Sequence, residues 1–320
     1  MTENEGYLLL VLPLIPLVSA IALMMIPAKE RTAIMLLTAI ASFAMFVISV
    51  YVFFAFDYKG EQFQGVVSWP WIENVAFLGG NGIQLKVGVD GIAAPMILLT
   101  GIVVLSGTWV SWKIEHRLKD FFILLFVLVA GVYGTFVALD LFFWFLLYET
   151  AVLPMYLLIA VWGSGRREYG AMKLMMMLVA ASILIFTAIF GIFTEAGLAT
   201  FDMPALFDAA YDENFQKIIF PMIVIGCGTL GGIFPFHPWS PDGHAAAPTA
   251  VSMLHAGVLM KLGAFGVLTI GIRLLPQGAV YWAPTFMVLA TIGIVYGAFV
   301  AIRQTDFKFV IGFSSVSHMG

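Results

Sequence analysis

The sequence has few charged residues and a single cysteine. Only 11% of its 320 residues are Asp, Glu, Lys or Arg, whereas 62% are hydrophobic. This balance excludes a soluble globular protein, in which apolar residues make up about half of the chain. Because Cys227 stands alone, internal disulfides and cysteine-based metal or iron–sulfur centres are also excluded within this chain. We therefore expect no cofactor or metal site here, and any redox cofactors to lie in other proteins.

Long apolar runs fill most of the sequence. A helix of about 20 apolar residues crosses a bilayer, and runs of this kind occur at 7–26, 31–56, 91–112, 121–139, 141–162, 173–193, 218–234, 250–274 and 281–302. A further run, 307–320, has only about 14 residues and is too short to cross. The sequence therefore predicts an all-α, polytopic transmembrane bundle of nine spans plus the start of a tenth, and suggests a piece of a longer protein.

The basic residues predict an orientation, because Lys and Arg gather in cytoplasmic loops. Alternate loops divide them ten to four, and Lys261 lies inside a span. The ten are Lys29, Arg31, Lys113, Arg117, Lys119, Arg166, Arg167, Lys173, Arg303 and Lys308; the four are Lys59, Lys86, Lys217 and Arg273. We expect the richer side to face the cytoplasm of a bacterial-type inner membrane, with the N-terminus outside. The net charge of −4 then averages a basic inner and an acidic outer side, and indicates no nucleic-acid partner.

The longest polar insertion, 57–90, separates the first two spans from the rest. It contains two alternating segments, 64–71 and 83–90, on either side of the glycine-rich stretch 79–82. This pattern predicts a small external β-hairpin. The chain then divides into two N-terminal helices (1–56), the hairpin (57–90) and the remaining helices (91–320).

Residues 234–249 interrupt the apolar pattern with four prolines and two histidines. Broken backbone at membrane depth survives only where protein or a water-filled cavity satisfies its polar groups. The pattern indicates a discontinuous seventh helix that lines an aqueous entry, although prolines also simply end helices. His237 and His244 suit proton acceptance near neutral pH. Together with Asp242 they lack a third well-spaced metal ligand, so no metal is expected.

Four ionisable residues lie at membrane depth. Glu149 is about nine residues into an apolar run, and Lys261 lies about 18 Å from the start of its helix by the helical rise. His255 and His318 lie at similar depth. Intramembrane charges are costly and mark ion or proton pathways. We therefore predict a proton path through these four residues, with a static Glu149–Lys261 ion pair as the alternative.

Several motifs resemble the antiporter-like membrane subunits of the proton-pumping NADH:quinone oxidoreductase, complex I, of the M-chain (subunit 4) type. The resemblance lies in the segments 148–159, 235–249, 256–266, 304–308 and 315–320. It implies a bundle of fourteen helices with two inverted five-helix repeats, of which 91–320 holds the first and the opening of the second. NADH, FMN, iron–sulfur clusters and quinone are then expected in partner subunits, beside the lipid bilayer and other membrane-arm subunits.

The resemblance also assigns roles. Glu149 matches the family's helix-five glutamate that couples neighbouring subunits, Lys261 matches its central lysine, and His318 matches a histidine on the connecting path. Lys308 falls in a matching motif and is a secondary candidate.

One position departs from the family pattern. A lysine is expected on the seventh helix where this chain has Leu230, so Glu149 would lack its usual counter-charge and be neutral more readily. Three readings stay open: a proton-conducting subunit, a non-pumping structural subunit of the same complex, and a subunit of an Mrp-type cation/proton antiporter.

Overall fold

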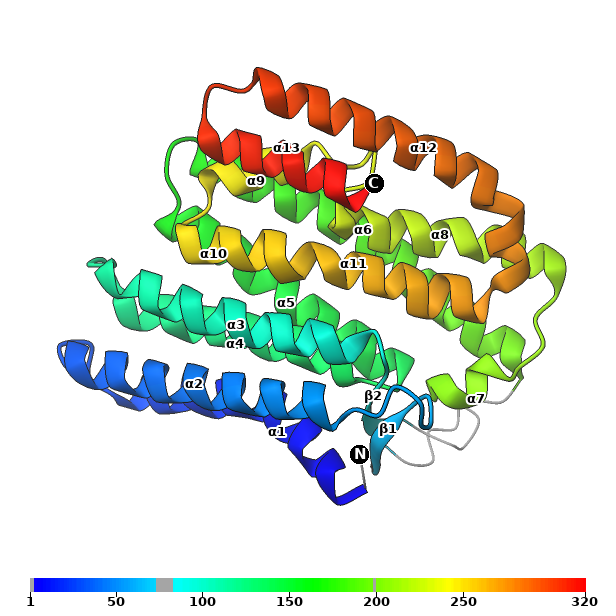
Figure 1. The fold of residues 1–320 in the computed structure, drawn as a ribbon, viewed down its shortest axis with the longest axis horizontal. Coiled ribbons are helices and arrows are strands. Elements are labelled where there is room, and N and C mark those ends of the chain that lie inside the picture. The colour runs from blue at the N-terminus through cyan, green and yellow to red at the C-terminus, as the bar shows by residue number, and fades with distance from the viewer. Residues whose placement is uncertain (1–2, 73–82, 198–199) are drawn as a thin grey trace.

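A computed structural model describes residues 3–72, 83–197 and 200–320. Within these residues nine helices are long and apolar enough to cross a membrane, which confirms the predicted bundle (Figure 1). They are α1 (Glu3–Met25), α2 (Arg31–Ala55), α3 (Ala93–Val110), α4 (Leu118–Val137), α5 (Leu141–Trp162), α6 (Arg167–Ala196), α8 (Glu213–Gly231), a composite helix over Thr249–Ile272, and α12 (Pro276–Arg303). Helices α6 and α8 begin earlier than the predicted spans 173–193 and 218–234, because polar residues extend them beyond their apolar stretch.

The helices lie roughly parallel in successive layers (Figure 1). Helices α1 and α2 pack beside α3 and α4, followed by α5 with α6, then α8, and finally α12 with α13 (Phe307–Met319). The α1–α2, α3–α4 and α12–α13 loops all lie at the same end of the bundle, left in the view, and we call this the basic end. The N-terminus, both strands and α7 (Met203–Phe207) lie at the other end, which we call the hairpin end.

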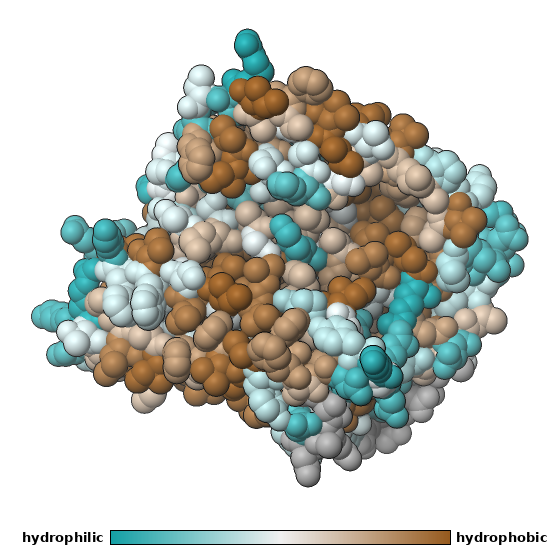
Figure 2. All heavy atoms as spheres, in the orientation of Figure 1, coloured by the Kyte–Doolittle hydropathy of each residue, from teal (hydrophilic) through white to brown (hydrophobic). Residues whose placement is uncertain are grey.

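The surface of the bundle also differs between its two ends and its middle. Hydrophilic residues gather at the two ends in Figure 2, while hydrophobic residues cover the long helix faces between them. Large apolar side chains are exposed along α2 and α12, among them Leu36, Phe43, Met287 and Phe299. An apolar band of this extent, bordered by polar ends, is the surface that a bilayer-spanning bundle presents to lipid or to other membrane subunits.

The predicted hairpin is confirmed. Strands β1 (Gln64–Ile72) and β2 (Ile83–Val89) pair antiparallel, with Val67 opposite Val87. The predicted glycine turn at 79–82 lies outside the described residues.

Aspartates begin several helices by accepting hydrogen bonds from unpaired backbone N–H groups of the first turn. Asp90 caps the N-terminus of α3 in this way, Asp140 that of α5, Asp212 that of α8 and Asp306 that of α13. Acidic residues favour this place because they also complement the positive end of the helix dipole. The short loops between spans therefore end at defined residues.

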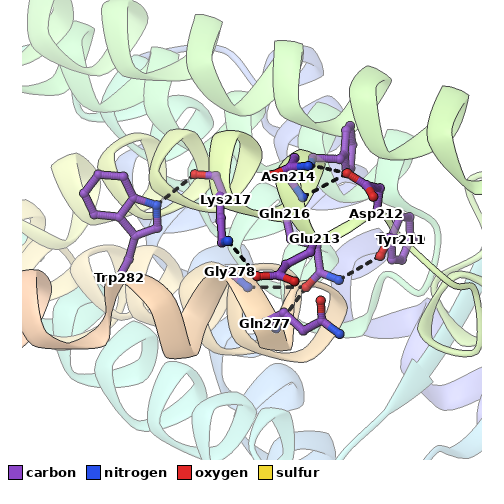
Figure 3. A network of polar contacts seen from close by, with 10 residues as sticks. Tyr211, Asp212, Glu213, Asn214, Gln216, Lys217, Gln277, Gly278 and Trp282 are labelled. Atoms are coloured by element: carbon purple, nitrogen blue, oxygen red, sulfur yellow. Dashed lines mark hydrogen bonds and ion pairs between the residues drawn. The ribbon is translucent and has the colours of Figure 1, made fainter.

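A side chain from α8 caps the N-terminus of α12 in the same way (Figure 3). The buried Gln216 Oε1 accepts hydrogen bonds from the N–H groups of Gln277, at 2.9 Å, and Gly278, at 3.4 Å. Trp282 Nε1 donates to the backbone carbonyl of Lys217 at 2.8 Å. Since first-turn N–H groups have no partner within their own helix, this network fixes α8 and α12 together at the hairpin end.

The interruption between the seventh and eighth spans is only partly irregular. Residues 232–238 are non-helical as predicted, but α9 (Trp239–Ala246) forms two turns of helix where irregular backbone was expected. Lys308 and an ion pair to Lys173, described below, stabilise α9 from neighbouring helices. These contacts come from distant parts of the chain, so the local proline pattern could not predict them.

Asp140 is a buried carboxyl at the hairpin end. It accepts hydrogen bonds from the N–H groups of Phe142 and Phe143, and a backbone bridge joins it to Asp202, whose carboxylate pairs with Lys86 at 2.7 Å. Burial is the main cause that raises the pKa of Asp140 from 3.8 to about 6, and the Asp202 carboxylate adds to the effect. The folded protein therefore holds this proton more tightly than the unfolded chain does.

Asp140→Asn is expected to change the pH dependence of stability. A raised folded-state pKa contributes stability that is complete below pH 3.8 and is lost as pH rises through about 6. The loss is on the order of 3 kcal/mol, and the neutral amide avoids it. Thermal unfolding of purified protein from pH 4 to 7 should show the variant gaining stability over the parent as pH rises. A matched control is Asp212→Asn, which alters an exposed cap; a pH-independent difference for Asp140→Asn contradicts the prediction.

Candidate functional site

Glu149 lies half-buried on α5 and contacts a hydroxyl of the next helix. Its Oε1 and Ser182 Oγ on α6 are 2.5 Å apart and form a hydrogen bond. Among the ion pairs of the described residues none includes Glu149 or Lys261. The structure therefore does not form the static Glu149–Lys261 pair that the sequence left open, and it adds Ser182, which sequence reasoning missed.

Lys261 lies on the composite helix Thr249–Ile272. This helix consists of α10 (Thr249–Leu254), the π segment η3 (His255–Leu259), α11 (Met260–Gly266) and a second π segment, η4 (Val267–Ile272). Lys261 Nζ donates a hydrogen bond to the backbone carbonyl of Ala256, within η3. Short π segments within α-helices occur frequently at functional sites. No feature of the sequence indicated them.

Two histidines meet in the core. The rings of His244, on α9, and His255, at the start of η3, stack with centroids 4.0 Å apart and planes 13° apart. Trp239 stacks on the opposite face of His255 at 5.0 Å. All three side chains are at most 1% exposed. The sequence predicted both histidines as candidates, but only folding brings them into contact.

Most of the nitrogens in this stack lack a hydrogen-bond partner within the described structure. His244 Nδ1 lies 3.1 Å from Ser252 Oγ, whereas His244 Nε2 and both ring nitrogens of His255 have none. Buried polar atoms are nearly always satisfied, so such groups call for a functional explanation. An imidazole nitrogen without a fixed partner can accept and release a proton.

Leu230 of α8 lies beside His255 and apolar side chains of α5 and α6. A small cavity of about 10 Å³ lies between Leu230, Leu178 and His255, with Trp239 also at its wall. This volume is at the lower limit for one water molecule. The position where the family pattern has a lysine is thus an apolar wall between α6 and η3.

Two other predicted histidines lie apart from the stack. His237 is in the 232–238 segment, where it stacks on Phe234 and contacts Tyr296 of α12 edge-on. His318, on α13, is half-buried, and its side chain forms no hydrogen bond with any described residue. Their predicted roles in a proton path stay predictions.

A hollow of about 610 Å³ opens at the basic end beside α9. Charged and polar residues contribute to its lining, among them Ser164, Arg166, Tyr169, Asp242, Asp306 and Lys308. Asp242 forms an ion pair with Lys173 at 2.6 Å, which ties α9 to α6. Two of the predicted secondary residues, Asp242 and Lys308, therefore line the same polar hollow. Asp242 lies two residues before His244 on α9.

Lys308 has a structural contact in this hollow. Its Nζ donates hydrogen bonds to the carbonyls of Ala245, at 3.3 Å, and Ala247, at 3.0 Å, at the C-terminal end of α9. A cation in this position satisfies carbonyls that lack helical partners and complements the helix dipole. The residue thus links the start of α13 to the segment that carries His244.

No group of three or more His, Cys, Asp or Glu side chains in the described residues could hold a metal ion. His255 and Lys261 lie on the same composite helix, and the His244 ring stacks on His255.

Comparisons with known proteins agree on one family. Residues 138–320 match the family described as "NADH:quinone oxidoreductase/Mrp antiporter, TM". The chain is 36% identical over 308 residues to NAD(P)H-quinone oxidoreductase chain 4 3 of Picosynechococcus sp., covering 96% of this chain and 55% of the relative. It is 35% identical to chain 4-2 of Synechocystis sp., with coverages of 96% and 54%. The chain therefore belongs to this family and is an integral, multi-pass membrane protein.

Solved structures show the same fold. A chain of respiratory complex I from Thermus thermophilus superposes with a TM-score of 0.84 at 23% identity, covering 97% of this chain and 62% of that one. A chain of the Mrp complex from Dietzia sp. gives a TM-score of 0.75 at 23% identity, covering 97% and 33%. At these identities the likeness concerns the fold alone. The chain spans about half the length of the curated relatives it matches.

Lys308→Met is expected to loosen α9 locally. Removing a charged donor from two carbonyls costs about 1.4 kcal/mol or more, so amide hydrogen exchange around 243–248 should speed up about tenfold. Lys119→Met is the matched control, because Lys119 Nζ donates in the same way to Met24 and Ile26 at the end of α1. Unchanged exchange at α9 in Lys308→Met, or equal changes there in both variants, contradicts the assigned contact.

Proposed function

We propose that this chain is part of a membrane-arm subunit of a complex I-type NADH:quinone oxidoreductase and conducts protons coupled to electron transfer elsewhere. The observation that supports this most is the buried His244–His255 stack with its unpartnered ring nitrogens. His255 lies on the same composite helix as Lys261, and His244 lies on α9, which lines the polar hollow at the basic end. Family membership supplies the context for this chemistry.

The proposed path starts in the hollow at Asp242. Protons pass to His244 along α9, then to His255 through the ring contact or an intervening water, and on to Lys261 within η3 and α11. Histidine suits each exchange because its charge changes near neutral pH. His318 would continue the path, with His237 near the entrance. Glu149, hydrogen-bonded to Ser182, would influence the path from α5.

The finer topology belongs to the same proposal. Helices α8 and α9 form a discontinuous seventh span, α13 opens a tenth span, and residues 91–320 act as one proton-translocating domain. The basic end faces the cytoplasm of a bacterial-type inner membrane and the N-terminus lies outside. NADH, FMN, iron–sulfur clusters and quinone are bound by partner subunits, and lipid surrounds the exposed apolar faces.

A second function is favoured by one observation. The apolar Leu230 stands where a lysine is expected, and the cavity that it lines beside His255 has room for at most one water molecule. In that case the chain is a structural subunit that does not pump. The antiporter alternative shares the fold and differs in that growth at high sodium and alkaline pH would depend on this chain.

Glu149→Gln and Lys261→Met should each lower the number of protons moved per electron. Both substitutions remove a titratable group and keep similar side-chain volume, so the complex should still assemble. The measurement is NADH-driven acidification of inverted membrane vesicles, normalised to electron flux and to the amount of assembled complex.

Thr187→Ala serves as the control, since it removes an exposed hydroxyl of α6 and no proposed proton carrier. A proton yield that stays at the parental value in both Glu149→Gln and Lys261→Met supports the structural function and contradicts the conducting one.

A further inference from the structure

The Ser182 hydroxyl has one proton and two acceptors within reach. Its Oγ is 2.8 Å from the backbone carbonyl of Leu178, one turn earlier on α6, and 2.5 Å from Glu149 Oε1 on α5. A serine hydroxyl donates one hydrogen bond and can accept two. If Glu149 is ionised, the single proton must serve both acceptors. If Glu149 is protonated, Glu149 donates to Ser182 and Ser182 donates to Leu178, so each contact has its own proton.

The charges around Glu149 favour the protonated form. No Lys, Arg or His of the described residues lies within ion-pair distance of its carboxyl. On α6 the cation nearest in sequence to Ser182, Lys173, is held by Asp242. On α8, Leu230 stands where a lysine is expected, and on the composite helix Lys261 binds Ala256. The ionisable groups on its own helix, such as Tyr148, supply no positive charge.

The surroundings of Glu149 would also penalise a bare carboxylate. Residues three before and four after it on α5, Leu146 and Leu153, are exposed apolar side chains on the same face. Ile183 and Phe186 extend this apolar face on α6. In lipid or against another membrane subunit this face has a low dielectric constant, where an unpaired charge is costly.

We propose that Glu149 is held as a neutral carboxylic acid at neutral pH, with Ser182 as the positioning residue that accepts its proton in a hydrogen bond. This inference deepens the proposed function and rests on it. Ser182 thus takes the place of a cationic partner: it orients the acid and leaves the proton available for release. Glu149 then acts as a proton donor whose charge appears only when a neighbouring positive charge or water approaches, and not as a permanent counter-ion.

Infrared difference spectroscopy of the full-length protein in its purified complex tests this state directly. The parent at neutral pH should show the carbonyl stretch of a protonated carboxyl, and Glu149→Gln should remove that band. Ser182→Ala should shift the band to higher frequency or abolish it, because the hydrogen bond is lost, and Ser182→Thr should restore it. Thr187→Ala, which removes a hydroxyl bonded only to its own helix, should leave the band in place.

Two results would overturn the proposal: no protonated-carboxyl band that depends on Glu149, or a band that Ser182→Ala leaves unchanged. The proton yield of the same complexes separates this proposal from the proposed function. A Glu149-dependent band with an unchanged proton yield in Glu149→Gln upholds the neutral acid and rejects conduction. A lower yield without the band upholds conduction and rejects the neutral acid.

Discussion

The cost of unsatisfied polar groups in a low-dielectric medium governs this structure. A spanning chain must pair its backbone groups within helices, and the nine long helices do so. Where helix stops, at 232–238, the neighbouring α9 is held by a lysine and an ion pair. The same cost makes each buried ionisable residue informative: Glu149 is bonded to Ser182 and Lys261 to a carbonyl, while His255 has ring nitrogens with no bound partner among the described residues.

The proposed proton route has one polar entrance and one apolar barrier. The hollow at the basic end leads through α9 to stacked imidazoles and then to Lys261. Leu230 and side chains of α5 line the small cavity beside His255. In the family pattern a lysine fills the position of Leu230. In this chain, a change of charge on Glu149 would therefore act on His255 through electrostatics or transient water, and not through a chain of charged side chains. The distinction matters for the proposal that Ser182 positions the proton on Glu149.

Hydropathy and charge were enough to predict the spans and the hairpin, because these depend on local composition. They also singled out Glu149, His255 and Lys261 as candidates, whose roles stay predictions. The sequence could not predict α9, whose stability comes from Lys308 and Lys173 far along the chain. It also missed the π segments, the Trp239–His255–His244 stack and the Ser182 contact. Each of these depends on how two or more helices pack, which the periodicity of one helix does not encode.

The most direct test of the account is the proton yield per electron after His255→Phe. Phenylalanine keeps an aromatic ring between Trp239 and His244 but has no nitrogen to carry a proton, so packing should survive. In fully assembled complexes the account predicts fewer protons moved at similar electron flux. A parental yield in this variant would contradict it, because protons would then cross without the buried imidazole that the route requires.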